Sequence, residues 1–320
     1  MKARVLVCLV VVVCAHAFGQ TPASTGTTTK DVPFVQQLRK TVTFIQMLCL
    51  NSSGTETDDV RGTAFFLTMP DERLGKDQGF FYLVTNRHVA ECWDEARHPR
   101  TVRAVLLRFN LIDGSSSNVP VSRNGNAHWI FPTDDSVDLA ILPLKPDETK
   151  VDYKAIPISA FATDDVIASR GVEEGTKIMF AGFFYQFAGQ KKMLPIVREG
   201  IIAMMPDEKL ENTTGRLGNA YLGDVHIFGG NSGSPVFVDV GGVHGNRLSG
   251  DEYHFLGVIS GLFYEDAEFN LTVATTLTGV THANSGIALI VPANDLKTLL
   301  DGREAQASRD ATVIKLKEGK

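Results

Sequence analysis

The sequence predicts an all-β fold with one helix near its C-terminal end. From Thr41 onward, short segments rich in β-branched and aromatic residues alternate with polar turn clusters such as 51–54, 113–116 and 241–242. Many short strands separated by turns, with few helical periods, are typical of a β-sandwich or β-barrel. Leu296, Leu299 and Leu300 have helical spacing, which predicts a terminal helix over 293–301.

The predicted strands are bounded by turn residues on both sides and are mostly apolar. They lie at 42–49, 62–67, 80–84, 102–109, 139–142, 177–181, 196–203, 236–238, 255–259 and 286–291.

The first 17 residues have the pattern of a secretory signal peptide. Lys2 and Arg4 precede an apolar run that ends at Cys14, and Ala15-His16-Ala17 offers a cleavage site. Lipid attachment at Cys14 is disfavoured because the bulky Val13 precedes it. The run is too short to span a bilayer, which takes about 20 apolar residues. We therefore expect a secreted or periplasmic protein without stable membrane insertion.

The rest of the chain divides by composition. Residues 18–33 read as a flexible linker, 34–306 as the folded domain and the charged stretch 307–320 as a frayed tail. Loss of Lys2 and Arg4 with the signal changes the formal charge from −6 to −8. A mildly acidic chain argues against a nucleic-acid partner, and no segment indicates an oligomeric state.

Cysteine and histidine usage predicts neither a metal nor a cofactor. Cys8 and Cys14 leave with the signal, so Cys49 and Cys92 remain. In an oxidising compartment an isolated pair favours a disulfide, with two separate buried thiols as the alternative. The histidines have no spacing that suggests a metal cage.

Three short segments carry the candidate chemistry. His88 follows the apolar run 80–84, Asp138 precedes the apolar run 139–142, and Ser232 lies between two glycines in the turn 230–235. A serine nucleophile needs a base, and the base needs a group that fixes its tautomer. We assign these roles to Ser232, His88 and Asp138, although Asp134 and Asp135 could compete for the last role. The backbone N–H groups of Gly230 and Ser232 would form an oxyanion hole.

The chain order His, Asp, Ser and the surrounding residues resemble those of the trypsin-like (chymotrypsin-fold) serine peptidases, and most closely the bacterial HtrA-type branch. The resembling segments are Gly62–Phe66, Thr85–Val89, Asp138–Leu142, Arg198–Ile202, Asp224–Pro235 and Ser285–Pro292. Ser234 departs from the pattern, because the family usually has glycine there. No room is left for a PDZ domain after the helix. We expect long loops at 185–193, 205–221 and 264–284, which have no obvious counterpart in the family.

The resemblance implies two six-stranded antiparallel barrels packed face to face, over about 34–146 and 150–292, with the active site in the cleft between them. It places His226, Ser260 and Gly261 at the substrate-binding site and makes a Cys49–Cys92 disulfide feasible. His226 occupies the position where a preference for Lys or Arg needs an aspartate. We therefore expect small or medium apolar residues before the cut; His226 could also point away, or accept an acidic residue when protonated.

The predicted function is that of a secreted serine endopeptidase that acts on peptides or unfolded proteins through a covalent acyl-enzyme. The main alternative is a catalytically silent trypsin-like domain that binds peptides or proteins. An esterase with the same triad is a third, less favoured interpretation.

Overall fold

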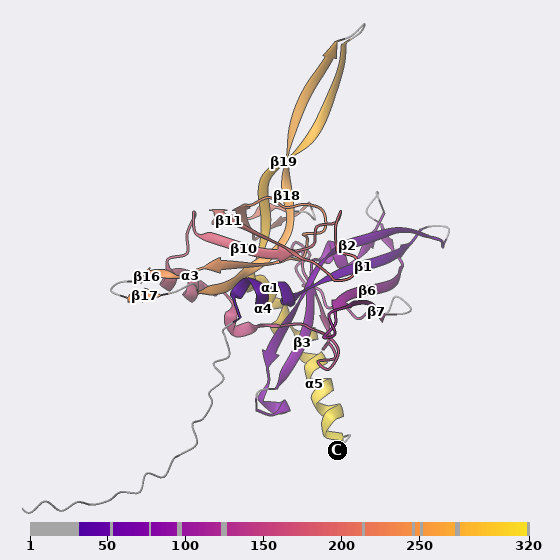
Figure 1. The fold of residues 1–320 in the computed structure, drawn as a ribbon, viewed down its shortest axis with the longest axis vertical. Coiled ribbons are helices and arrows are strands. Elements are labelled where there is room, and N and C mark those ends of the chain that lie inside the picture. Colours follow the sequence, from indigo (N-terminus) through magenta and orange to yellow (C-terminus); the bar gives the residue numbers. More distant parts are fainter. Residues whose placement is uncertain are drawn as a thin grey trace, which may run out of the picture. The chain divides into compact units, whose positions relative to one another are not determined.

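A computed structural model describes residues 32–318, apart from 52–53, 77, 95–97, 123–126, 213–214, 245–246, 250–251 and 273–275. The predicted signal peptide, and the linker up to residue 31, lie outside the described residues. Residues Pro33–Lys320 form one compact unit (Figure 1). No helix in the part of the chain that the structure describes is long and apolar enough to cross a membrane.

The N-terminal half is a mainly antiparallel sheet of seven strands in the order β7-β6-β1-β2-β3-β8, with β9 pairing in parallel with β2. Its elements are α1 Phe34–Thr41, β1 Val42–Leu50, β2 Glu56–Pro70, β3 Gly79–Thr85, α2 Arg87–Ala90, β4 Cys92–Trp93, β5 Pro99–Arg100, β6 Val102–Asn110, β7 Ser116–Ser122, β8 Ala140–Pro143 and β9 Ile156–Pro157. The short pair β4–β5 lies outside this sheet.

The C-terminal half is a closed barrel of six strands in the order β10-β11-β14-β19-β18-β15. Its elements are α3 Asp164–Arg170, β10 Lys177–Gly182, β11 Ile196–Met204, β12 Leu210–Glu211, β13 Leu217–Gly218, β14 Tyr221–Asp224, β15 Pro235–Asp239, β16 Gly242–His244, β17 Arg247–Ser249, β18 Tyr253–Thr272 and β19 Thr276–Pro292. The helices α4 Ala293–Asp301 and α5 Arg303–Glu318 follow.

Neighbouring residues in a strand point to opposite faces, and this alternation builds the cores. Phe65 and Phe66 of β2 illustrate it: both are buried, but they belong to different apolar clusters. Phe66 packs within the N-terminal sheet, whereas Phe65 meets Phe255 of β18 with ring centroids 5.5 Å apart. The cluster that contains Phe65 therefore joins the two halves.

Two predictions about the fold are confirmed, namely the mainly β architecture and the helix over 293–301, which is α4. A closed six-stranded barrel is present in the C-terminal half. The expectation of a frayed tail over 307–320 is corrected by the structure. Helix α5 continues to Glu318 and buries Arg309 and Val313. Arg309 donates to the Tyr82 hydroxyl at 3.0 Å and to the Leu300 carbonyl at 2.8 Å.

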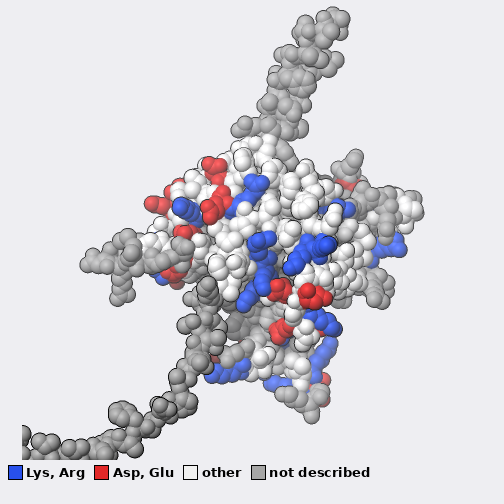
Figure 2. Space-filling model, viewed as in Figure 1, with Lys and Arg blue, Asp and Glu red and all other residues white. Residues whose placement is uncertain are grey.

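The segment 264–284 is also not a loop. Strands β18 and β19 stay paired from Gly257 with Pro292 as far as Thr272 with Thr276. The outer part of this pair extends beyond the barrel as a two-stranded ribbon (Figure 1). On the face shown in Figure 2, basic and acidic side chains are interspersed, so this face has no continuous basic track.

Candidate active site

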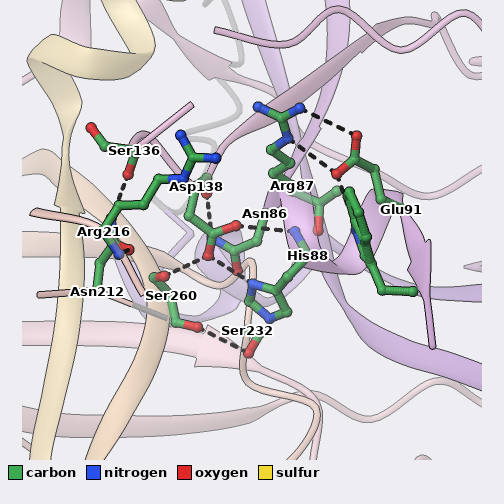
Figure 3. Close-up of polar contacts among 12 residues, drawn as sticks. Asn86, Arg87, His88, Glu91, Ser136, Asp138, Asn212, Arg216, Ser232 and Ser260 are labelled. Carbon is green, nitrogen blue, oxygen red and sulfur yellow. Dashed lines mark hydrogen bonds and ion pairs between the residues drawn. The ribbon is translucent and has the colours of Figure 1, made fainter. Parts of the chain in front are cut away.

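His88 and Asp138 form a hydrogen-bonded pair at the ends of two neighbouring strands (Figure 3). β3 ends at Thr85 and leads into the single turn α2, which carries His88, while Asp138 lies just before β8. His88 Nδ1 and Asp138 Oδ2 are 2.7 Å apart, and the His88 backbone N–H donates to Asp138 Oδ1 at 3.0 Å. Since β3 pairs with β8, the sheet itself brings the two residues together.

Buried Asp138 has two further hydrogen bonds that the sequence did not reveal, one to its carboxylate and one to its backbone carbonyl. The Ser260 hydroxyl donates to Asp138 Oδ2 at 2.6 Å, and Asn86 Nδ2 donates to the Asp138 carbonyl at 2.9 Å. Ser260 lies at a β-bulge, because Ile259 and Gly261 pair with consecutive residues of β19. A bulge re-aims a side chain, and here the hydroxyl points at Asp138 from the opposite half of the molecule.

The charges of this pair are coupled. Burial alone would lower the pKa of the His88 imidazole, but the charge and hydrogen bond of Asp138 outweigh burial and raise that pKa above its usual 6.5. Burial would raise the pKa of Asp138, but His88 and the hydrogen bonds of Ser260 and the His88 backbone hold it below its usual 3.8. The His88 side chain is 35% exposed, whereas that of Asp138 is fully buried. The imidazole can therefore face both a substrate and a fixed anion.

Ser232 lies on a tight turn beside the His88 ring (Figure 3). Its hydroxyl donates to the Ser260 carbonyl at 3.3 Å. Among the described residues, no hydrogen bond joins this hydroxyl to the His88 ring. Gly233 follows with φ +87°, and a Cβ there would lie 1.9 Å from the Thr63 carbonyl oxygen. Glycine is thus required for the turn to pack against β2.

The N–H groups of Gly230 and Ser232 are available at this turn. Within the described part of the chain, neither donates to a protein acceptor. The Gly229 carbonyl accepts from the Tyr185 N–H at 3.3 Å. Because a trans peptide points its C=O and N–H in opposite directions, the Gly230 N–H faces away from Tyr185. This geometry suits an oxyanion hole.

Asn231 holds the turn from inside. Its side chain is buried, donates to the Phe183 carbonyl at 2.7 Å and accepts from the Phe228 N–H at 2.7 Å. The neutral amide therefore joins the turn to the end of β10 without an ion pair.

A second clasp joins the two halves at Thr63. The Thr63 hydroxyl donates to the Gly230 carbonyl at 2.7 Å and accepts from the Phe183 N–H at 3.0 Å. The Thr63 backbone N–H donates to the Ser232 carbonyl at 2.8 Å. β2 is therefore bonded directly to the segment that carries Ser232.

Ser234, which departs from the family pattern, and the predicted substrate-binding residues His226 and Gly261 have the following places in the structure. Ser234 is buried, and a Cβ at Gly182 would lie 2.0 Å from its hydroxyl, so a serine fits because residue 182 is glycine. His226 is exposed, and its ring lies 3.4–3.5 Å from where a Cβ of Gly286 would stand. Gly261 follows Ser260 on β18.

The Cys49–Cys92 disulfide is present, with 5.9 Å between the Cα atoms. It joins β1 to the strand that follows α2, so it tethers the His88 segment to the N-terminal sheet. The alternative of two separate thiols does not hold in this structure.

No other chemistry-bearing cluster competes with this site in the described ranges. They contain no group of three or more His, Cys, Asp or Glu side chains that could hold a metal ion. A cavity of about 770 Å³ lies over β6 and β7, and its lining includes Phe109, Ile112, Val119 and Leu144 but none of the three candidate catalytic residues.

Comparison with protein families gives a match over more than half of the chain. The family described as "Trypsin-like peptidase domain" matches residues 62–245, a span that includes His88, Asp138 and Ser232. A search of curated proteins found no match.

Proposed function

From the premise that this chain belongs to the family of trypsin-like peptidase domains, we propose that it is an exported serine endopeptidase with the triad His88, Asp138 and Ser232. The observation that carries the proposal is the pair of hydrogen bonds between His88 and a buried Asp138, 2.7 and 3.0 Å long, with Ser232 beside the imidazole. Such a pair fixes the tautomer in which Nε2 can accept a proton.

In the first step, His88 Nε2 takes the proton of the Ser232 hydroxyl while the oxygen attacks the substrate carbonyl. The N–H groups of Gly230 and Ser232 bind the developing oxyanion. His88 then gives the proton to the leaving amine, and the acyl-enzyme forms. Water, activated by the same imidazole, releases the acyl group and regenerates Ser232.

The proposal extends to the two-barrel arrangement and to export. Isolated bridges join Leu111 to Val151 and Ile130 to Ile141, which supports treating the N-terminal sheet as a second, more open barrel. A disulfide near His88 is suited to an oxidising compartment. These features support a secreted or periplasmic peptidase acting on peptides or unfolded proteins.

A fluorophosphonate probe tests the proposal, because only an activated serine reacts readily with it. We expect stoichiometric labelling of Ser232, cleavage of a denatured protein, and loss of both in Ser232→Ala. Ser234→Ala is the matched control, since that hydroxyl is buried two residues away. A folded wild type without labelling would favour the silent binding domain, and labelling with ester but no peptide turnover would favour the esterase.

Activity should not require a second cut. In many animal relatives, a new N-terminus pairs with an aspartate before the serine, but Asn231 already holds this turn with two uncharged hydrogen bonds. We expect full activity once the signal is removed. Mature chain that becomes active only after cleavage near Thr41 would contradict this.

Cleavage should not follow Lys or Arg. His226 supplies no anion for a basic side chain, so we expect small or medium apolar residues before the cut. Mass-spectrometric profiling of a digested denatured protein tests this expectation. A dominant Lys/Arg preference would overturn it.

A further inference from the structure

The segment that connects β11 to β14 contacts the turn that precedes Asp138. Within it, β12 and β13 form a small hairpin. At the hairpin, Asn212 Nδ2 donates to the Ser136 carbonyl, a contact between residues 76 positions apart (Figure 3). The turn belongs to the N-terminal half and the hairpin to the C-terminal half, and no pattern in the sequence predicts that they are in contact.

Two more contacts lie at the same place. A Cβ at Gly218 would lie 2.9 Å from Asn212 Nδ2 and 3.0 Å from the Ser136 carbonyl oxygen, so β13 approaches the turn as closely as glycine permits. Arg216 forms an ion pair with Asp135, but both side chains are about half exposed. An exposed pair contributes little, which leaves the Asn212 amide as the main polar contact.

The turn has its own internal bonds up to the residue before Asp138. The Ser136 N–H donates to Asp134 Oδ1 at 2.9 Å, and the Val137 N–H donates to the Asp134 carbonyl at 3.1 Å. Neither of these bonds uses the Ser136 carbonyl, which lies two residues from Asp138 and accepts from Asn212 of the hairpin. Small displacements of a catalytic group, near 1 Å, cost on the order of 100-fold in rate.

We propose that Asn212 is a positioning residue for Asp138: by binding the Ser136 carbonyl it fixes the turn that presents the carboxylate to His88. This inference rests on the proposed function for its kinetic consequences. Asn212 touches neither the substrate nor the reacting atoms; it acts through the backbone of Ser136.

The sign of the effect follows from the electrostatics of the pair. The charge and hydrogen bond of Asp138 raise the pKa of His88. A displaced Asp138 stabilises the imidazolium less, so the pKa of His88 falls and kcat falls with it. KM should change little, because the substrate cleft is untouched.

The test uses two variants that disturb one contact from opposite sides. Asn212→Leu removes the donor and keeps the branched shape of the side chain, and Gly218→Ala inserts a methyl group between Asn212 and Ser136. Leu217→Ala is the control, since this neighbouring side chain in β13 is 63% exposed. We expect kcat to fall about tenfold in the first two with KM within about twofold, as for loss of one hydrogen bond near the reacting groups. The control should keep wild-type values.

The pKa of His88, followed by NMR titration, separates this inference from the proposed function. We expect it to fall in Asn212→Leu and Gly218→Ala and to stay unchanged in Leu217→Ala. Wild-type kcat and His88 pKa in either folded variant would overturn the inference, as would a loss confined to KM. If Asn212→Leu does not fold, Gly218→Ala decides by the same criteria. Absence of wild-type turnover and probe labelling would overturn the proposed function, while the titration would still test Asn212.

Discussion

The two halves of the molecule hold their share of the candidate site by different means. The C-terminal barrel closes on itself through six strands and carries Ser232 on a turn clasped by Asn231. The N-terminal sheet, which carries His88 and Asp138, has β7 and β8 as its end strands in the pairing order. It is secured instead by the Cys49–Cys92 disulfide and by α5, whose Arg309 reaches Tyr82.

This difference has a physical basis. Closure pairs every strand of a barrel with two neighbours, whereas a sheet with end strands needs other attachments. We therefore expect substitutions in the N-terminal half to show separable effects on chemistry and on stability. Four predictions test this comparison, in order of decreasing effect.

Replacement of His88 should have the largest effect on chemistry and a smaller one on stability, because the buried Asp138 carboxylate loses its partner. His88→Ala should lower kcat by on the order of 10⁴-fold or more, because the three residues act as a unit. Its side chain is 35% exposed, so little packing is lost. His98→Ala is the control, since that side chain is 75% exposed. Wild-type turnover in folded His88→Ala protein would remove His88 from the site.

Removal of the disulfide should have the largest effect on stability. The bond closes a loop with a sequence separation of 43, and Cys49→Ala/Cys92→Ala should lower the free energy of unfolding by about 4 kcal/mol on the chain-entropy account. Urea unfolding, monitored by fluorescence and circular dichroism, measures it. One shared transition would indicate that the cluster containing Phe65 couples the halves. A separate first transition at lower urea concentration, confined to the N-terminal half, would show that its sheet unfolds first. An unchanged free energy of unfolding would contradict the prediction.

The buried Arg309 should contribute less. Arg309→Met removes two hydrogen bonds from a side chain that is 6% exposed. We expect a loss of about 2 kcal/mol in the free energy of unfolding, as for hydrogen bonds to a charged group, with kcat preserved. Arg303→Met, an exposed change on the same helix, is the control. Equal stability of the two variants would show that α5 does not secure the sheet.

The smallest effect concerns pH. His88 must be neutral to accept a proton, so kcat/KM should fall about tenfold per pH unit on an acid limb whose midpoint lies above 6.5. Because the folded pKa of His88 is raised, its stabilising contribution is full below 6.5 and disappears as pH rises through the folded value. The lowered pKa of Asp138 acts oppositely: its contribution is present above 3.8 and is lost as pH falls through the folded value.

The Asn231 clasp does not titrate, so it should add no pH dependence of its own. A pH–rate profile, with NMR titration of His88 in Ser232→Ala, measures the limb. An acid limb centred below 6.5 would contradict the prediction.

Local sequence pattern predicted much of the fold. Each predicted strand overlaps a strand of the structure, because alternation and turn chemistry are short-range signals. The pattern missed β14 at Tyr221–Asp224, which is four residues long and closes the barrel between β11 and β19. It also took 264–284 for a loop, because the pairing of β18 with β19 depends on register between strands and not on either strand alone.

The candidate triad could be named from sequence because each member lies in a short motif at a strand end, whereas its supports could not. Ser260 meets Asp138 across 122 positions, Asn86 across 52 and Asn212 meets Ser136 across 76. A serine or asparagine in a polar stretch carries no signal of a distant partner.

The sequence by itself determined the mainly β class, the α4 helix and the positions of three candidate catalytic residues, because periodicity, turn residues and motifs are written over a few neighbouring positions. Only the tertiary structure decided that one barrel closes through β14, that α5 clamps the sheet, and that hydrogen bonds from opposite halves converge on Asp138 and the turn before it. These features depend on how the two halves pack around Phe65 and Phe255. Packing buries polar groups that are far apart in the sequence, and buried polar groups are stable only when they form hydrogen bonds.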